Sequence, residues 1–154
     1  MFKRKTTYIL TFIILLSACC GNHSEIDKTS GSSGDKTRPQ ITLYYLHQKR
    51  QCKTCKAITL VTEKVIKDFF SNELRQGLVI YENQFLNDVP SLAEKYKCVF
   101  AGIYIVAAND KFETISDLTK PSFYLATSNP DSLEKLLVQT IRIKLDSIKK
   151  NNSL

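Results

Sequence analysis

The chain has 154 residues, a length that fits one compact domain of ordinary size rather than two. It contains 22 Lys and Arg residues against 15 Asp and Glu residues, which gives a formal net charge of +7 at pH 7. Residues 1–18 hold three of the basic residues and no acidic residue, so the remainder carries a net charge of about +4.

The first residues are typical of an export signal. A basic start at residues 3–5 precedes an apolar stretch from Tyr8 to Leu16, which is shorter than the about 20 apolar residues of a membrane-spanning helix. The stretch ends in Leu16-Ser17-Ala18-Cys19, which resembles the bacterial lipoprotein signal. That resemblance implies a signal peptide over residues 1–18 and a lipid, such as palmitate, on Cys19. The alternative is an uncleaved hydrophobic anchor.

The segment after this signal is typical of a flexible tether. From Gly21 to Gln40 the sequence is rich in Ser, Gly, Asp, Lys and Thr, and Ile26 is its only hydrophobic residue. We therefore expect a tether over residues 19–40, a domain over residues 41–150, and lipid anchoring in the bacterial cell envelope, on the periplasmic or outer membrane side. In that compartment a net charge of about +4 gives no support to nucleic-acid binding, and disulfides can persist.

The first half of the domain predicts a strand, a helix and a strand. Residues Ile41 to Leu46 are β-branched, aromatic or aliphatic, as in a strand buried on both faces. From Thr54 to Leu74 apolar residues recur every three or four positions, which predicts a long helix that Gly77 stops. A second strand opens at residues 78–81.

The second half predicts a short helix, two strands and a closing helix. Val89 to Tyr96 begins with a proline in its first turn, and Ile103 to Ala107 is a clear strand. Phe112 to Leu118 is a weaker edge strand, and Ser128 or Asn129 can cap an amphipathic helix that runs to about residue 150. The order is β-α-β-α-β-β-α, an α/β fold.

The segment Cys52-Lys53-Thr54-Cys55 lies between the first strand and the first helix. At such a junction free backbone N–H groups favour thiolate over thiol at the first cysteine. The second cysteine follows one helical turn later, so the two sulfurs can form a disulfide. The pattern predicts thiol–disulfide exchange with protein thiols or disulfides of the envelope, in which Cys52 attacks and Cys55 resolves. Four nearby basic residues are expected to favour the thiolate further: Lys49, Arg50, Lys53 and Lys56.

From Ile41 to about Lys150 the sequence resembles the thioredoxin-like superfamily. Tyr44-Tyr45-Leu46-His47, the segment from Arg50 to Cys55 and Thr62-Glu63-Lys64 look closest to the small ArsF-type family, labelled a nitrophenyl compound nitroreductase subunit. The resemblance implies the minimal thioredoxin fold with its redox motif at the start of the first helix. The sequence has no Gly-rich phosphate loop for a flavin or nicotinamide, so no cofactor is expected.

Two residues depart from the thioredoxin pattern. Gln51 stands where thioredoxins place a tryptophan, and Gly102, preceded by Ala101, stands at the position of their cis-proline. Because that proline shapes the groove that accepts substrate, glycine there predicts a different groove and easier access for a metal.

Other functions for the same residues stay open. His47, Cys52 and Cys55 supply three ligands suited to Cu(I) or Zn(II), which would make a metal-binding or metallochaperone module. A structural disulfide between Cys52 and Cys55 in a non-catalytic interaction module is a further alternative. Cys98 is expected to be a buried, inert thiol, and no role is expected for Cys20.

Overall fold

The computed structural model describes residues 40–152. The predicted signal peptide, the lipid site at Cys19 and all of the predicted tether except Gln40 lie outside the described residues. Within residues 40–152, no helix is both long enough and apolar enough to cross a bilayer.

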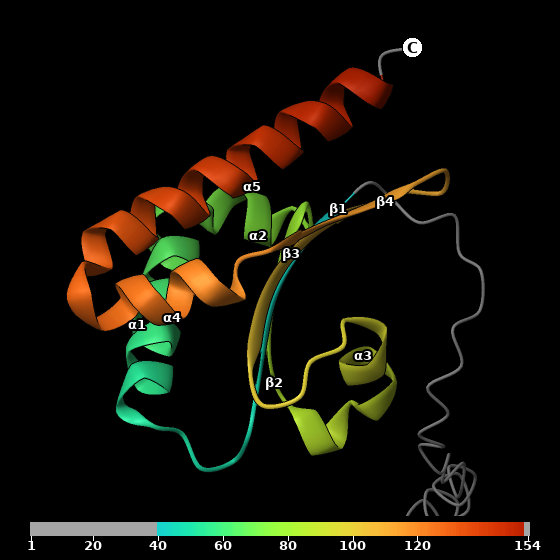
Figure 1. Ribbon diagram of the computed structural model, residues 1–154. Helices are drawn as coiled ribbons and strands as arrows, with labels where there is room; N and C mark the ends of the chain where they lie inside the picture. The colour runs from blue at the N-terminus through green and yellow to red at the C-terminus, as the bar shows by residue number, and fades with distance from the viewer. Residues whose placement is uncertain (1–39, 153–154) are drawn as a thin grey trace, which may run out of the picture. The chain divides into compact units, whose positions relative to one another are not determined.

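The domain is built on one mixed four-stranded sheet with the order β2-β1-β3-β4 (Figure 1). The first strand pairs in parallel with the second and antiparallel with the third, which pairs antiparallel with the fourth. All four predicted strands are confirmed, and their bounds are β1 (Gln40–His47), β2 (Val79–Phe85), β3 (Gly102–Ala108) and β4 (Glu113–Asp117).

Helices lie on both faces of the sheet. In Figure 1, α1, α4 and α5 lie on one side of the strands and α3 on the other. The helices of the described part are α1 (Lys53–Phe69), α2 (Ser71–Arg75), α3 (Pro90–Lys95), α4 (Thr119–Ser128) and α5 (Pro130–Asn152), with a short 3₁₀ helix η1 (Leu86–Asp88). The fold is therefore a mixed α/β fold, as the sequence predicted.

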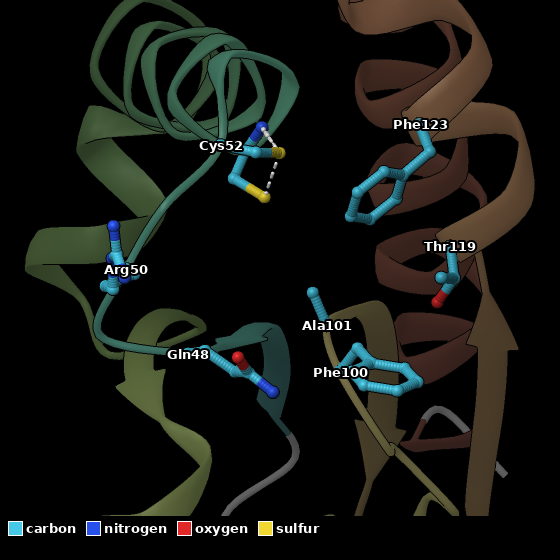
Figure 2. Close-up of a pocket in the computed structure, with 8 residues that line it drawn as sticks. Gln48, Arg50, Cys52, Phe100, Ala101, Thr119 and Phe123 are labelled. Atoms are coloured by element: carbon cyan, nitrogen blue, oxygen red, sulfur yellow. Dashed lines mark hydrogen bonds between the residues drawn. The ribbon is translucent and has the colours of Figure 1, made fainter.

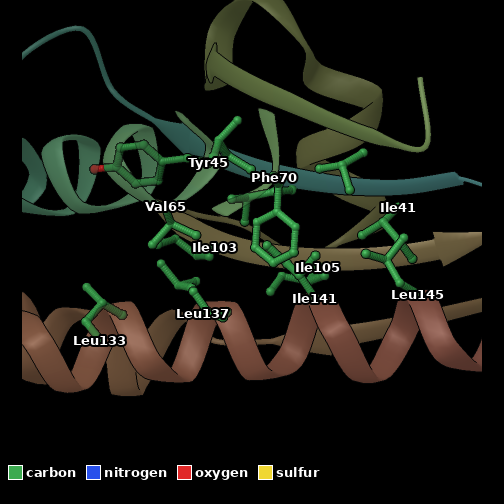
Figure 3. Packing of buried hydrophobic residues seen from close by; sticks show 14 of the residues in the cluster. Ile41, Tyr45, Val65, Phe70, Ile103, Ile105, Leu133, Leu137, Ile141 and Leu145 are labelled. Atoms are coloured by element: carbon green, nitrogen blue, oxygen red, sulfur yellow. The ribbon is translucent and has the colours of Figure 1, made fainter. Parts of the chain in front are cut away.

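The larger core lies between the sheet and helices α1, α4 and α5. Side chains alternate along a strand, so every second residue of β1 faces these helices and is fully buried. The core joins this face of the strands to the apolar stripes of the helices (Figure 3), and its members include Ile41, Leu43, Tyr45, Ile58, Val65, Ile103, Ile105, Leu133, Leu137 and Ile141. Burial of these side chains stabilises each helix against the sheet.

A smaller core covers the opposite face of the sheet and is built around tyrosines. The ring of Tyr96, the residue after α3, lies 5.6 Å from that of Tyr44 and stacks 4.8 Å from that of Tyr104. A β-carbon at Gly102 would fall 2.5 Å from Cε2 of Tyr104, because residues two apart on a strand share a face. Glycine at position 102 therefore leaves room for the Tyr104 ring.

Two helices differ from their predicted form. The helix predicted over residues 54–74 is two helices, with the break at Phe70, whose φ of −131° is not helical and whose side chain is buried. Gly77 has a φ of +68°, which confirms it as the turn that ends this segment. Helix α4 was not predicted; Pro121 lies in its first turn, where the missing N–H costs little.

Candidate functional site

The cysteine pair lies where the sequence predicted, between β1 and α1. Cys52 is the residue before the first turn of α1, with an extended backbone (φ −73°, ψ 172°). Its sulfur accepts a hydrogen bond of 3.2 Å from the backbone N–H of Cys55, one of the N–H groups that a helix leaves unpaired at its start. The fold therefore presents the Cys52 sulfur to the positive end of the helix.

The two thiols have opposite properties although they are neighbours. Their sulfurs are 2.7 Å apart, and Cys52 is exposed whereas Cys55 is half-buried. The hydrogen bond with the Cys55 thiol, followed by the backbone N–H of Cys55, lowers the pKa of Cys52. Burial, followed by the hydrogen bond with Cys52, raises the pKa of Cys55. The arrangement favours a thiolate on the more accessible sulfur.

The neighbouring basic side chains are not among the main causes of the lowered pKa of Cys52. The main causes of the lowered pKa of Cys52 are the Cys55 thiol and backbone N–H groups, and no lysine or arginine is among them. All four basic residues are exposed: Lys49, Arg50, Lys53 and Lys56. Water screens such charges, so their effect on the sulfur is small.

Two hydroxyl groups fix the backbone beneath the pair. The hydroxyls of Tyr45 and Thr59 each donate a hydrogen bond of 3.2 Å to the carbonyl oxygen of Cys55. Tyr45 is fully buried, and burial raises its pKa, so its hydroxyl stays protonated and donates at neutral pH. The first turn of α1 is thereby tied to β1.

His47 supports the loop that leads to Cys52. Its side chain is 4% exposed, with Nδ1 2.8 Å from the carbonyl oxygen of Gln48 and Nε2 2.7 Å from Oδ1 of Asn83. The amide nitrogen of Gln51 lies 3.1 Å from Nε2 of His47 and donates to the hydroxyl of Thr59 at 3.3 Å. Gln51 thus connects the end of β1 to α1.

The structure does not group His47 with the two cysteines as metal ligands. Across residues 40–152, no three side chains of His, Cys, Asp or Glu come together in a way that could hold a metal ion. Both ring nitrogens of His47 are already in hydrogen bonds with protein groups. Neither ring nitrogen of His47 is therefore directed at the sulfurs of Cys52 and Cys55.

The cysteines open onto a groove of about 410 Å³. Figure 2 shows Cys52, Gln48 and Arg50 along one side, and Phe123, Thr119 and Phe100 along the other. Cys55 and Ala101 complete the lining, and no acidic residue contributes to it. The sequence did not predict the second wall, because that wall depends on α4. The signal that could have indicated it is Phe100, a large apolar residue whose side chain is 72% exposed.

The second wall is fixed to the sheet at its base. The hydroxyl oxygen of Thr119 accepts a hydrogen bond of 3.1 Å from the backbone N–H of Ile103, and the N–H of Thr119 donates to Asp117 at 2.8 Å. Ser122, one turn further along α4, is fully buried, and its hydroxyl has no hydrogen-bond partner.

The position predicted to match a cis-proline holds no cis peptide bond, since none of the described peptide bonds is cis. Gly102 packs against Tyr104, while Ala101 lines the groove.

Cys98 belongs to the other side of the sheet. It is half-buried rather than buried as predicted, and it packs against the smaller core. Burial raises the pKa of its thiol, while a hydrogen bond with Tyr104 opposes this effect. Cys98 is therefore a weakly acidic thiol outside the groove.

Comparisons with known proteins identify no relative of known function. No family model matches it, and no curated protein matches it. One solved structure, described as "Structure of a malarial protein", is 15% identical over 56% of this chain and 92% of its own, with a TM-score of 0.38. A likeness this weak indicates neither a fold family nor a function.

Proposed function

We propose that this protein catalyses thiol–disulfide exchange through Cys52 and Cys55 in a thioredoxin-like domain. The observation that carries the proposal is the asymmetry of the pair, in which an exposed thiol of lowered pKa lies 2.7 Å from a less exposed thiol of raised pKa. An attacking thiolate next to a resolving thiol is what exchange through a mixed disulfide requires.

The reaction has two steps. The Cys52 thiolate attacks one sulfur of a substrate disulfide, forms a mixed disulfide and releases the other substrate sulfur as a thiolate. Cys55 then loses its proton and attacks Cys52, which forms the Cys52–Cys55 disulfide and releases the second substrate thiolate. Two electrons pass from the protein to the substrate, and the reverse sequence oxidises a substrate dithiol.

The topology supports the thioredoxin-like assignment. The sheet order is β2-β1-β3-β4, in which β1 pairs in parallel with β2 and antiparallel with β3, and β3 pairs antiparallel with β4. This arrangement agrees with the β-α-β-α-β-β-α order implied by the resemblance. Helix α4, between β4 and α5, is an addition to that order.

We propose further that the protein is anchored in the bacterial cell envelope by a lipid on Cys19, a residue outside the described part of the chain. Export to that compartment would expose the pair to protein thiols and disulfides. Cells grown with labelled palmitate should label the wild-type protein and the Cys20→Ala variant. Label that persists in Cys19→Ala would contradict the assignment of the lipid site.

Reduction of insulin disulfides by dithiothreitol tests the exchange activity. We expect the full-length protein to accelerate it and Cys52→Ser to lose the acceleration, whereas Cys98→Ser, whose thiol lies outside the groove, keeps it. Cys55→Ser should accumulate a mixed disulfide with insulin, detectable by mass spectrometry, because the resolving thiol is absent.

Three outcomes would overturn the proposal. Insulin reduction that is unchanged in Cys52→Ser would exclude Cys52 as the attacking thiol. A pair that stays disulfide-bonded in freshly lysed cells, and whose replacement changes only the melting temperature, would identify a structural disulfide instead. Stoichiometric copper or zinc that disappears in Cys55→Ser, without exchange activity, would identify a metal-binding module.

A further inference from the structure

The surface around Cys52 carries positive charge that the protein does not neutralise. Between residues 40 and 62 there is no acidic residue, and four exposed cations flank the cysteines: Lys49, Arg50, Lys53 and Lys56. In the described part of the chain the ion pairs involve other lysines, so none of these four has a carboxylate partner. Lys49 lies 5.9 Å from the ring of Phe85, a contact that leaves its charge uncompensated.

Two of these cations occupy positions that are unfavourable for the folded domain. Lys53 is the first residue of α1 and Lys56 follows in the same turn, where the helix has its positive end and no acidic residue. A cation there destabilises the helix, because helix N-termini favour negative charge. An anion that binds nearby would offset this cost.

The groove itself also carries positive charge without a carboxylate. Arg50 lines it beside Cys52, and its other charged or polar lining residues are Gln48 and Thr119, with no carboxylate (Figure 2). The facing wall offers the rings of Phe100 and Phe123. These cations are exposed beside the groove, so their charge acts on a substrate segment that approaches Cys52.

We infer that the preferred substrate is a disulfide held in an acidic polypeptide segment. This inference rests on the proposed exchange function and names the substrate class of the same groove. Carboxylates flanking the substrate disulfide would lie against Arg50 and the lysines while Cys52 attacks the nearer sulfur. The reaction is the exchange already described: the mixed disulfide forms, Cys55 resolves it, and two substrate thiolates leave.

The size of the effect follows from electrostatic steering. Complementary charge raises association rates by roughly 10-fold or more at low ionic strength. The Debye length falls from about 30 Å at 0.01 M salt to about 3 Å at 1 M, so the preference should disappear in high salt.

Two peptide disulfides of equal length provide the test. One is the symmetric disulfide of acetyl-Phe-Glu-Cys-Glu-amide and the other has Gln in place of both Glu residues. Stopped-flow measurements on the reduced full-length protein would give the ratio of the two rates. The same ratio is measured with dithiothreitol as the reductant. Dividing the protein's ratio by the dithiothreitol ratio removes the difference in intrinsic reactivity between the two peptides. We expect a normalised ratio of about 10 in 20 mM salt that falls below about 2 in 1 M salt.

Charge variants assign the effect to this surface. The double variant Arg50→Gln with Lys53→Gln should lower the rate with the Glu peptide by about 5-fold more than it lowers the rate with the Gln peptide. The control Lys67→Gln removes an exposed cation from the last turn of α1 and should change neither rate.

A normalised ratio near 1 at low salt, or a ratio that the double variant leaves unchanged, would overturn the inference. The proposed exchange function would survive that result if both peptides still react at Cys52. Loss of reaction with both peptides in the wild-type protein would instead overturn the exchange function itself.

Discussion

The Cys52–Cys55 pair and Cys98 are the same kind of residue in two different environments. The pair lies at the start of a helix, open to a groove, with backbone N–H groups directed at the first sulfur. Cys98 lies between α3 and β3, beside the tyrosines of the smaller core. The pKa of Cys52 is lowered, and the pKa of Cys98 is raised by burial.

This difference teaches that hydrogen bonds from the neighbouring Cys55 thiol and then from the backbone, more than charged side chains, lower the pKa of Cys52. Lysines and an arginine surround Cys52, yet the hydrogen bonds to its sulfur come from Cys55 and from the peptide backbone. Cys98 has no helix start next to it, because α3 ends at Lys95 and β3 begins at Gly102.

The largest expected difference between the two regions is in alkylation by iodoacetamide. At pH 7 Cys52 should react about 100-fold faster than Cys98, since the thiolate is the nucleophile and Cys52 has both the lower pKa and the greater exposure. The ratio should narrow as the pH rises above the ordinary thiol pKa of 9.0, where Cys98 also ionises. Mass spectrometry of the alkylated peptides gives both rates. Equal rates at pH 7 would contradict the comparison.

The next largest effect is expected from Gly102→Ala. The added methyl group would overlap the Tyr104 ring, which is buried and stacked on Tyr96, so the domain should lose about 1 to 3 kcal/mol of unfolding free energy. Urea denaturation measures this loss. In a Tyr104→Leu background the same substitution should cost at least about 1 kcal/mol less, and equal costs in both backgrounds would exclude the overlap as the cause.

Tyr45→Phe tests the hydrogen bond that supports the Cys52–Cys55 pair, and its expected effect is smaller. Loss of the hydroxyl that donates to the Cys55 carbonyl should cost about 1 kcal/mol of unfolding free energy. The same hydroxyl lowers the pKa of Cys55, so its loss should slow release of the mixed disulfide by about 3-fold. Tyr81→Phe is the matched control, because its hydroxyl bonds Thr62 at 3.0 Å and touches neither cysteine. If release of the mixed disulfide slowed equally in both variants, the loss of stability, and not the hydroxyl of Tyr45, would be the cause.

The smallest effect is expected from Tyr104→Phe on the Cys98 side. The variant removes a hydrogen bond that lowers the pKa of Cys98, so alkylation of Cys98 at pH 8 should slow by about 2- to 3-fold. The rate at Cys52 should stay the same, because Cys52 has no contact with this ring. A slower Cys52 would indicate that the two regions are coupled.

Local sequence patterns predicted much of the fold. The strands at residues 41–46 and 103–107 and the helix that Asn129 caps are encoded by apolar periodicity and by local capping residues. The break at Phe70 could not be predicted in this way, because the apolar period continues through it and burial of the Phe70 ring decides the geometry.

The site was predicted only on one side. The cysteine pair is local, so four adjacent residues were enough to place it at the start of α1. Phe100, Thr119 and Phe123 reach the groove from segments about 50 to 70 residues away, through a helix with Pro121 in its first turn and a weak apolar pattern. The sequence offers His47 as a third metal ligand, but its contact with Asn83 depends on β2 pairing beside β1, which the residues next to His47 do not encode.

The unpartnered hydroxyl of Ser122 has a consequence for how the groove wall fluctuates. A buried hydroxyl without a partner costs about 1 to 3 kcal/mol, and water repays that cost whenever α4 separates from the sheet. Local opening of α4 is therefore easier than it would be with alanine at this position. Amide hydrogen exchange in α4 would therefore slow in the Ser122→Ala variant, because the wall bearing Phe123 would open less often.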